Sequence, residues 1–194
     1  MASYFSNTSH YPAFSELPAV STDQSPNAQP PPISPPEATT WWLLAQIKEN
    51  MTITQPTLIV TDRTGVDFAL LFDDHTANLR GFKKGYTLAV PGARRTERAG
   101  VGKKAVVHVP ADRTAEVKVV PGSLERVLEL GVVLGSEGGG GKCAACGDEE
   151  GMLMKCTGCA VAAYCGKDCQ VKAWGEMGHK LNCKVLRALQ DVVI

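Results

Sequence analysis

All seven cysteines of this 194-residue chain lie within residues 143–183, and the same window holds His179. The eight side chains form four close pairs along the sequence: Cys143 and Cys146, Cys156 and Cys159, Cys165 and Cys169, and His179 and Cys183. Structural zinc sites take four tetrahedral nitrogen or sulfur ligands. The eight candidate ligands therefore predict two closed zinc sites with no ligand left over.

Each pair has a spacing that zinc sites use. A Cys-x2-Cys turn brings two thiolates to one side of a tight loop. Cys165 and Cys169 are four residues apart, as are His179 and Cys183, so each of these pairs shares one face if it lies on a helix. The spacing alone allows the four pairs to combine either sequentially or in an interleaved way.

Disulfides, redox motifs and a catalytic thiol fit the cysteine pattern less well than zinc does. Disulfides are rare in reducing compartments, and an odd number of cysteines cannot be fully paired within the chain. Thioredoxin-like Cys-x2-Cys motifs need βαβ surroundings, which this glycine-rich window lacks. A catalytic cysteine would be one residue with a partnered base. So small a segment has few large aliphatic residues, so metal binding must supply most of its folding free energy.

The window also resembles a MYND-type zinc finger. The resemblance rests on the complete ligand order together with Tyr164-Cys165-x3-Cys169-Gln170-x3-Trp174 and the closing run His179-Lys180-Leu181-Asn182-Cys183. One difference is the run Gly175-Glu176-Met177-Gly178, which places four residues between Trp174 and His179, where the family often has two. We expect a kink or loop before His179 for this reason.

The resemblance implies a cross-braced finger with interleaved sites. Carried over by position, zinc 1 is held by Cys143, Cys146, Cys165 and Cys169, and zinc 2 by Cys156, Cys159, His179 and Cys183. It also implies a protein-interaction module that takes short proline-containing peptides beside a strand-and-helix surface, with Gln170 and Trp174 on that surface. Similar proteins act in transcriptional regulation or in ubiquitin-ligase assemblies, so we expect a zinc-binding adaptor of this kind.

Composition divides the rest of the chain. Residues 1–40 hold eight of the 12 prolines and no lysine or arginine, which predicts a disordered Pro- and Ser-rich tail. Within it, Pro26–Pro36 favours polyproline II. Residues 136–142 read as a glycine-rich linker before the finger at 143–183. A C-terminal helix is predicted over Lys180–Val192, and residues 184–194 form its extension beyond the finger.

Residues 41–135 predict a small β-rich domain, barrel-like or α+β, that ends in a helix. Trp41–Gln46 suits a short helix or an opening strand, and Ser123–Leu130 suits a helix that Ser123 caps. Five short β-branched runs separated by turn residues predict strands: Thr52–Thr61, Val66–Phe72, Gly85–Val90, Lys104–Val109 and Glu116–Val120. An oligonucleotide-binding-like barrel is one candidate architecture. This domain, with Leu79–Glu97 and the stretch Val119–Leu130, resembles a segment that accompanies such fingers in fungal proteins.

A basic stretch in this domain suggests an alternative function. Between Arg80 and Lys104 there are eight basic residues and one acid, Glu97, with Phe82 and Tyr86 interleaved. Single-strand binding combines cations on phosphates with rings that stack on bases. Binding of single-stranded nucleic acid is therefore the alternative, and a solvated basic loop is the simpler interpretation.

Several classes of protein are not expected. No nucleophile–base pair or paired-carboxylate motif can be picked out, so we expect no enzyme activity. The 20 basic and 20 acidic residues balance, so no global charge attracts nucleic acid or anionic lipid. No apolar run approaches the roughly 18 to 20 residues of a membrane span, and Met1–Phe14 has no secretory signal pattern. We expect an intracellular protein, nuclear or cytoplasmic, without a membrane partner.

Overall fold

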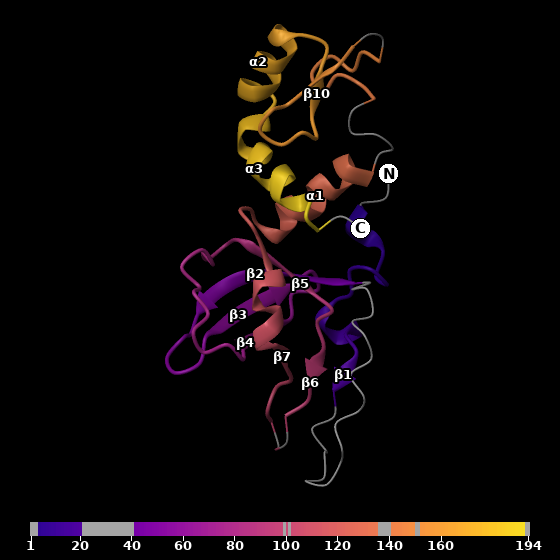
Figure 1. Ribbon diagram of the computed structural model, residues 1–194. Coiled ribbons are helices and arrows are strands. Elements are labelled where there is room, and N and C mark those ends of the chain that lie inside the picture. The colour runs from indigo at the N-terminus through magenta and orange to yellow at the C-terminus, as the bar shows by residue number, and fades with distance from the viewer. Residues whose placement is uncertain are drawn as a thin grey trace. The chain divides into compact units, whose positions relative to one another are not determined.

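The computed structural model describes residues 4–20, 41–98, 100, 102–135, 141–149 and 152–192. These residues form two compact units, drawn as ribbons in Figure 1. The sheet unit comprises residues 7–119, and the finger unit comprises residues 4–6 and 120–192. The predicted domain over residues 41–135 therefore ends earlier than expected, and its terminal helix belongs with the finger.

The sheet unit is built on a mixed sheet of eight strands in the order β1-β6-β7-β4-β3-β2-β5-β8. The strands are β1 Ala19–Val20, β2 Trp42–Asn50, β3 Thr57–Asp62, β4 Asp67–Phe72, β5 Thr87–Pro91, β6 Arg95–Thr96, β7 Val106–Val109 and β8 Lys118–Val120. β4 pairs with β7 in parallel, as β1 does with β6. The pairs β2–β3, β3–β4, β2–β5 and β6–β7 are antiparallel.

The sheet is strongly curled. Three strands separate β5 from β7 in the sheet order, yet the ends of both strands line one cavity. The curl encloses a core to which β3 and β4 contribute every second residue, as the period of a strand requires. β5 is buried at all five positions. The barrel-like, β-rich prediction therefore describes this unit well.

Each of the five predicted strand regions contains a strand, and Trp41–Gln46 opens β2 rather than a helix. The prediction for Thr52–Thr61 began too early, because β3 starts only at Thr57 and residues 51–56 form the loop between β2 and β3. The strands β1 and β6 were missed. Each has two residues, which is too short to give a detectable alternation.

Residues 4–20 correct the prediction of a disordered tail over residues 1–40. They contain the 3-10 turns η1 (Tyr4–Ser6) and η2 (Phe14–Glu16) as well as β1, and they bury Phe5, Tyr11, Phe14 and Leu17. The Phe14 ring stacks on Phe68 with 4.2 Å between centroids. The prediction was wrong here because the prolines of residues 21–40 dominated the composition of the whole segment. Residues 21–40, including the polyproline prediction for Pro26–Pro36, lie outside the described residues.

Asp62, at the end of β3, ties the N-terminal segment to the sheet. It is 3% exposed. Its Oδ2 accepts a hydrogen bond from the backbone N–H of Phe14 at 2.7 Å. Its Oδ1 accepts from the backbone N–H groups of Thr64 and Val66 and from the Thr64 hydroxyl. One buried carboxylate therefore holds both the β3–β4 turn and η2.

The finger unit contains three helices and a small ribbon within its described residues. They are α1 Leu124–Gly135, α2 Lys167–Gly175, α3 His179–Leu189, β9 Met154–Lys155 and β10 Ala163–Tyr164. α1 packs against α3 and η1. A Cβ on Gly122, just before α1, would lie 3.0 Å from Val185 on α3. The predicted linker at 136–142 therefore joins two parts of one unit instead of separating two domains; its residues 136–140 lie outside the described ranges.

All of the described helices are short. α1 is the longest at 12 residues, whereas a span of the bilayer needs about 20. Within the described ranges, no helix has the length and apolar character needed to cross a membrane.

Candidate metal centre

The structure gathers the eight cysteine and histidine side chains of residues 143–183 into two sets of four. The first set is Cys143, Cys146, Cys165 and Cys169, and the second is Cys156, Cys159, His179 and Cys183. Within each set the ligand atoms all lie within 4.8 Å of one another. The first pair thus meets the third and the second meets the fourth. This is the interleaved arrangement that the family resemblance implied and that the spacing alone left open.

The distances within the first cluster suit zinc. In a tetrahedral site with Zn–S bonds of about 2.3 Å, the sulfur atoms lie about 3.8 Å apart. The Sγ atoms of Cys146 and Cys165 are 3.6 Å apart, and those of Cys165 and Cys169 are 3.5 Å apart. All seven cysteines are free thiols, so these short distances are not disulfides.

The second cluster has the same dimensions with one nitrogen ligand. The Sγ atoms of Cys156 and Cys183 are 3.8 Å apart. The His179 Nε2 lies 3.3 Å from the Cys156 sulfur and 3.7 Å from the Cys159 sulfur. All four residues are buried. Three thiolate sulfurs and one imidazole nitrogen that converge in this way are the ligand set of a closed structural zinc site.

Two similar turns position the first ligands of the two clusters. The carbonyl of Cys143 accepts a hydrogen bond from the N–H of Gly147 at 2.9 Å, and the carbonyl of Cys156 accepts one from the N–H of Ala160 at 2.7 Å. Gly147 and Ala160 both have positive φ angles, 78° and 56°. Each turn holds its two cysteines on one side of the chain, as the Cys-x2-Cys spacing predicts.

The second turn also brings its backbone very close to the metal ligands. A Cβ added to Gly158 would lie 2.7 Å from the Sγ of Cys183 and 3.7 Å from that of Cys156. A separation of 2.7 Å is shorter than Cβ atoms tolerate, so any larger residue at position 158 would collide with the sulfur of Cys183. Glycine at this position therefore allows Cys183 to reach the second cluster.

Three of the four remaining ligands lie on helices, which corrects one of the predicted positions. His179 and Cys183 lie one turn apart on α3, as expected. Cys165 and Cys169 do not share a helix, because α2 begins only at Lys167 and Cys165 lies in the turn before it. Gly178, with φ 72°, separates α2 from α3 and forms the expected kink before His179.

The electrostatics of the clusters favour a bound cation. Backbone hydrogen bonds, the strongest from Cys146, lower the pKa of the Cys143 thiol to about 6, which favours the metal-binding thiolate. Burial lowers the pKa of His179 and so keeps the imidazole neutral, the form that binds zinc. Burial raises the pKa of the Cys183 thiol to about 12. A thiolate at that buried position requires a neighbouring positive charge.

The two residues that the resemblance places on a peptide surface lie on α2. Gln170 is partly buried. Trp174 is 43% exposed, and its ring centroid lies 5.8 Å from that of His179. The buried Tyr164 ring also packs edge to face on His179, with 6.0 Å between ring centroids. The metal cluster and the two aromatic rings therefore form one packed group.

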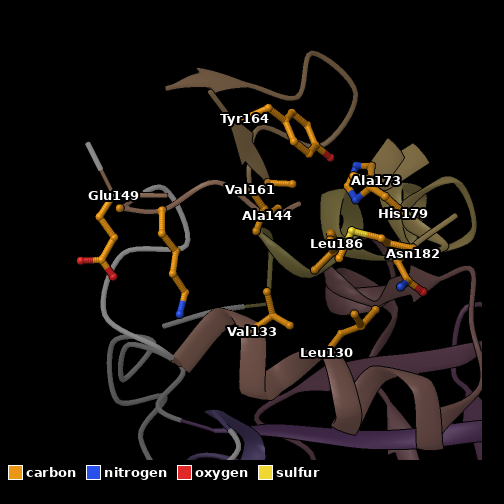
Figure 2. Close-up of a pocket in the computed structure, with 14 residues that line it drawn as sticks. Leu130, Val133, Ala144, Glu149, Val161, Tyr164, Ala173, His179, Asn182 and Leu186 are labelled. Carbon is orange, nitrogen blue, oxygen red and sulfur yellow. The ribbon is translucent and has the colours of Figure 1, made fainter. Parts of the chain in front are cut away.

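A cavity of about 560 Å³ lies within the finger unit (Figure 2). Leu130 and Val133 reach into it from α1, and Val161, Ala173 and Leu186 line it from the finger. Met177, from the run of four residues between Trp174 and His179, also contributes. The cavity was not predicted from the sequence, because the apolar stripe on α1 was recognised but assigned to the other domain.

The basic stretch Arg80–Lys104 serves in part to hold the sheet unit together. Phe82 is half-buried and packs edge to face on Phe72, with 5.7 Å between ring centroids. Tyr86 packs against the core. Arg95 pairs with Glu97 at 2.9 Å and donates to the carbonyl of Ser15. The two rings expected to stack on bases are thus engaged in packing.

Comparison with known proteins agrees with this geometry. The family model for the MYND finger matches residues 143–183, the range that begins and ends with a metal ligand. No curated protein matches the chain. MYND fingers are zinc-binding protein-interaction modules, and the two clusters indicate two zinc ions. Residues 143–183 of this protein are a MYND finger.

Proposed function

We propose that the protein is a non-catalytic adaptor whose finger recruits partners that carry short proline-containing segments. The observation that carries this proposal is Trp174, an indole that is 43% exposed yet held against the ligand His179. Exposed aromatic rings with a fixed orientation bind proline rings well, because little side-chain freedom is lost on docking. The eight ligand residues, bound to two zinc ions, would hold this surface in place.

The helical side of the proposed surface offers a polar group beside the indole. Gln170 and Trp174 are four residues apart on α2 and therefore lie on one face. No hydrogen bond of the Gln170 side chain is found within the described part of the chain. Its amide is available to bind the backbone carbonyls of an extended peptide, which proline-rich segments leave exposed.

The finger also exposes several large apolar side chains. Met152, Met154, Val171, Trp174, Met177 and Leu181 are all between 43% and 91% exposed. Met154 belongs to β9, which pairs only with β10 among the described strands. The free edge of this ribbon can accept an extended segment as a further strand. Exposed methionines favour adaptable contacts with apolar partners.

The absence of catalysis is part of the proposal. Each cluster has four protein ligands, and a closed site of that kind leaves no position for a reactive water. Recruitment through such a module suits a transcriptional-regulatory or ubiquitin-ligase assembly, as the family resemblance implies.

A binding experiment on the full, zinc-loaded chain tests the peptide surface. We expect a fluorescent peptide with a Pro-Pro-Pro-Ile core to bind, and Trp174→Ala to weaken the binding at least tenfold by fluorescence anisotropy. An aromatic side chain that becomes buried at the centre of an interface commonly contributes about 2 kcal/mol or more to the binding free energy. Its loss corresponds to a change in affinity of this size.

Two further variants keep this test specific. Gln170→Ala removes no side-chain hydrogen bond found in the described residues, so the finger should keep its fold and its two zinc ions while the binding weakens. Lys172→Ala alters an exposed residue of the same helix and should leave the affinity within about twofold. Full affinity in both Trp174→Ala and Gln170→Ala, with two zinc ions retained, would show that the peptide surface lies elsewhere.

A further inference from the structure

The curled end of the sheet unit encloses a second cavity, of about 280 Å³. Its walls come from the ends of β5 and β7, from β6 and from the 3-10 helix η3 (Ala111–Glu116) with the residue that follows it. Val90, Val109 and Val117 supply apolar side chains to the lining, and each is less than a tenth exposed. Mouths of curled sheets and barrels are common positions for small ligands.

The lining of this cavity also contains basic side chains. They are those of Arg94, Arg113 and His108, and Thr96 lies among them in the lining. No aspartate or glutamate is found among the described residues of the lining. A lining that combines apolar side chains with two guanidinium groups complements a ligand with an aliphatic body and an anionic head.

Arg113 is held in one orientation. Its Nε and Nη2 donate to Oε2 of Glu116 at 3.0 and 2.9 Å. Its Nη1 lies over Gly92, where a Cβ would come within 2.9 Å of that nitrogen. A larger residue at position 92 would therefore displace the guanidinium. A cation that is already oriented loses less conformational freedom when a ligand binds.

Arg94 extends from a loop that Trp41 holds through two hydrogen bonds. The N–H of Gly92 donates to the carbonyl of Trp41 at 3.0 Å, and the Trp41 indole Nε1 donates to the carbonyl of Ala93 at 3.0 Å. Arg94 follows directly and is exposed. It makes no hydrogen bond or ion pair within the part of the chain that the structure describes.

His108 also lines the cavity. Its Nδ1 lies 2.9 Å from Oδ1 of Asp73, an acid that is not part of the lining. The two acids that contact these side chains, Asp73 at His108 and Glu116 at Arg113, are not part of the lining. The charged groups of the lining itself are the guanidinium groups of Arg94 and Arg113.

We propose that the sheet unit binds short aliphatic carboxylates in this cavity. Arg94 and Arg113 would pair with the carboxylate, since the planar guanidinium matches its two oxygens, and the aliphatic chain would lie against the three valines. A free short-chain acid and the C-terminus of a peptide ending in an aliphatic residue share this chemistry. The site is independent of the finger and of the function proposed for it.

Titration of the full, zinc-loaded chain with sodium pentanoate tests the proposal. We expect saturable changes in the amide NMR signals of Gly92 and Thr96, with a Kd on the order of 1 mM for so small a ligand. Pentanamide keeps the shape without the charge, and inorganic phosphate keeps an anion without the aliphatic chain. Both should bind at least about tenfold more weakly.

A second arm distinguishes the two sources of the carboxylate. An acetylated peptide that ends in valine with a free carboxylate is compared with the same peptide amidated at its C-terminus. Tighter binding of the free-acid peptide than of pentanoate identifies a peptide C-terminus as the ligand, and weaker binding identifies a small acid. Binding of the amidated peptide as tight as that of the free acid contradicts the proposal.

Matched arginine variants complete the test. Arg94→Gln alters an exposed residue, so the fold should be unaffected, and we expect the Kd for pentanoate to rise about tenfold. Arg98→Gln alters an exposed arginine outside the lining and should leave the Kd unchanged. The proposal is overturned by an unsaturable response at about fifty times the expected Kd, by equal binding of pentanamide, or by an unchanged Kd in Arg94→Gln.

Discussion

Replacing Cys156 with serine will unfold the finger unit and leave the sheet unit folded. Cys156 is 4% exposed, and its sulfur lies 3.8 Å from that of Cys183 and 3.3 Å from Nε2 of His179. Zinc contributes on the order of 10 to 16 kcal/mol to the folding of finger peptides, whereas whole domains are stable by only about 5 to 15 kcal/mol. The free energy lost with the second zinc ion should therefore exceed the free energy of unfolding of the finger unit.

The effect should reach beyond the finger itself. His179 and Cys183 lie on the first turns of α3, and α3 packs against α1. NMR spectra of Cys156→Ser should lose the dispersed signals of α1 and α3, whereas buried residues of the sheet unit, such as Phe72 and Leu88, should keep theirs. Thr157→Ala, at an exposed neighbouring position, serves as the control and should retain every signal. A folded finger in Cys156→Ser would contradict the second metal site.

Asp62→Ala will cost the sheet unit on the order of 3 to 5 kcal/mol. The substitution leaves the N–H groups of Phe14, Thr64 and Val66 without their acceptor. Each buried donor without a partner costs about 1 to 3 kcal/mol, and water that enters after the loss of η2 will recover a part of this. Urea unfolding followed by the amide signals of β3 and β4 measures the change.

Two other aspartate variants make this result specific. Asp62→Asn can keep the three hydrogen bonds to Oδ1 and loses the one to Phe14, so it should destabilise less and free the η2 region selectively. Asp67→Ala removes an exposed ion pair with Lys48 and should leave the unfolding midpoint nearly unchanged, because exposed pairs contribute little. Equal midpoints in Asp62→Ala and Asp67→Ala would show that Asp62 does not anchor the segment.

The metal clusters could be predicted far better than the units that contain them. Ligand type and local spacing carry the coordination chemistry, so Cys143 to Cys183 predicted two sites from the sequence alone. The spacing did not determine how the four pairs combine, because sequential and interleaved pairing both give each zinc ion four ligands. In the structure Cys156 and Cys183 belong to the same cluster, so the pairing is interleaved. A ligand motif of this kind predicts that a metal is bound, but it does not predict which helices or strands pack against the site.

Unit boundaries were harder to predict because they depend on long-range packing. The apolar stripe of α1 was visible in the sequence, but nothing local shows that it packs against α3 instead of the sheet. Likewise, Phe5 and Phe14 lie in a proline-rich context that suggests disorder, yet both are buried. A few large apolar residues outweigh a polar composition when a partner such as Phe68 is available.

The cavity beside Arg94 could not have been predicted. Its lining comes from residues scattered between positions 20 and 117, and only the curl of the sheet brings them together. From the sequence, the basic stretch Arg80–Lys104 suggested binding of single-stranded nucleic acid instead. Its arginines divide between packing, as for Arg95, and the cavity wall, as for Arg94.

The metal content of the full chain tests the central claim most directly. Native mass spectrometry of protein purified under reducing conditions, combined with elemental analysis, gives both the number and the identity of the bound ions. The two clusters, with four ligands each, predict two zinc ions per chain. One zinc ion per chain, or none, in fully reduced protein would contradict the account.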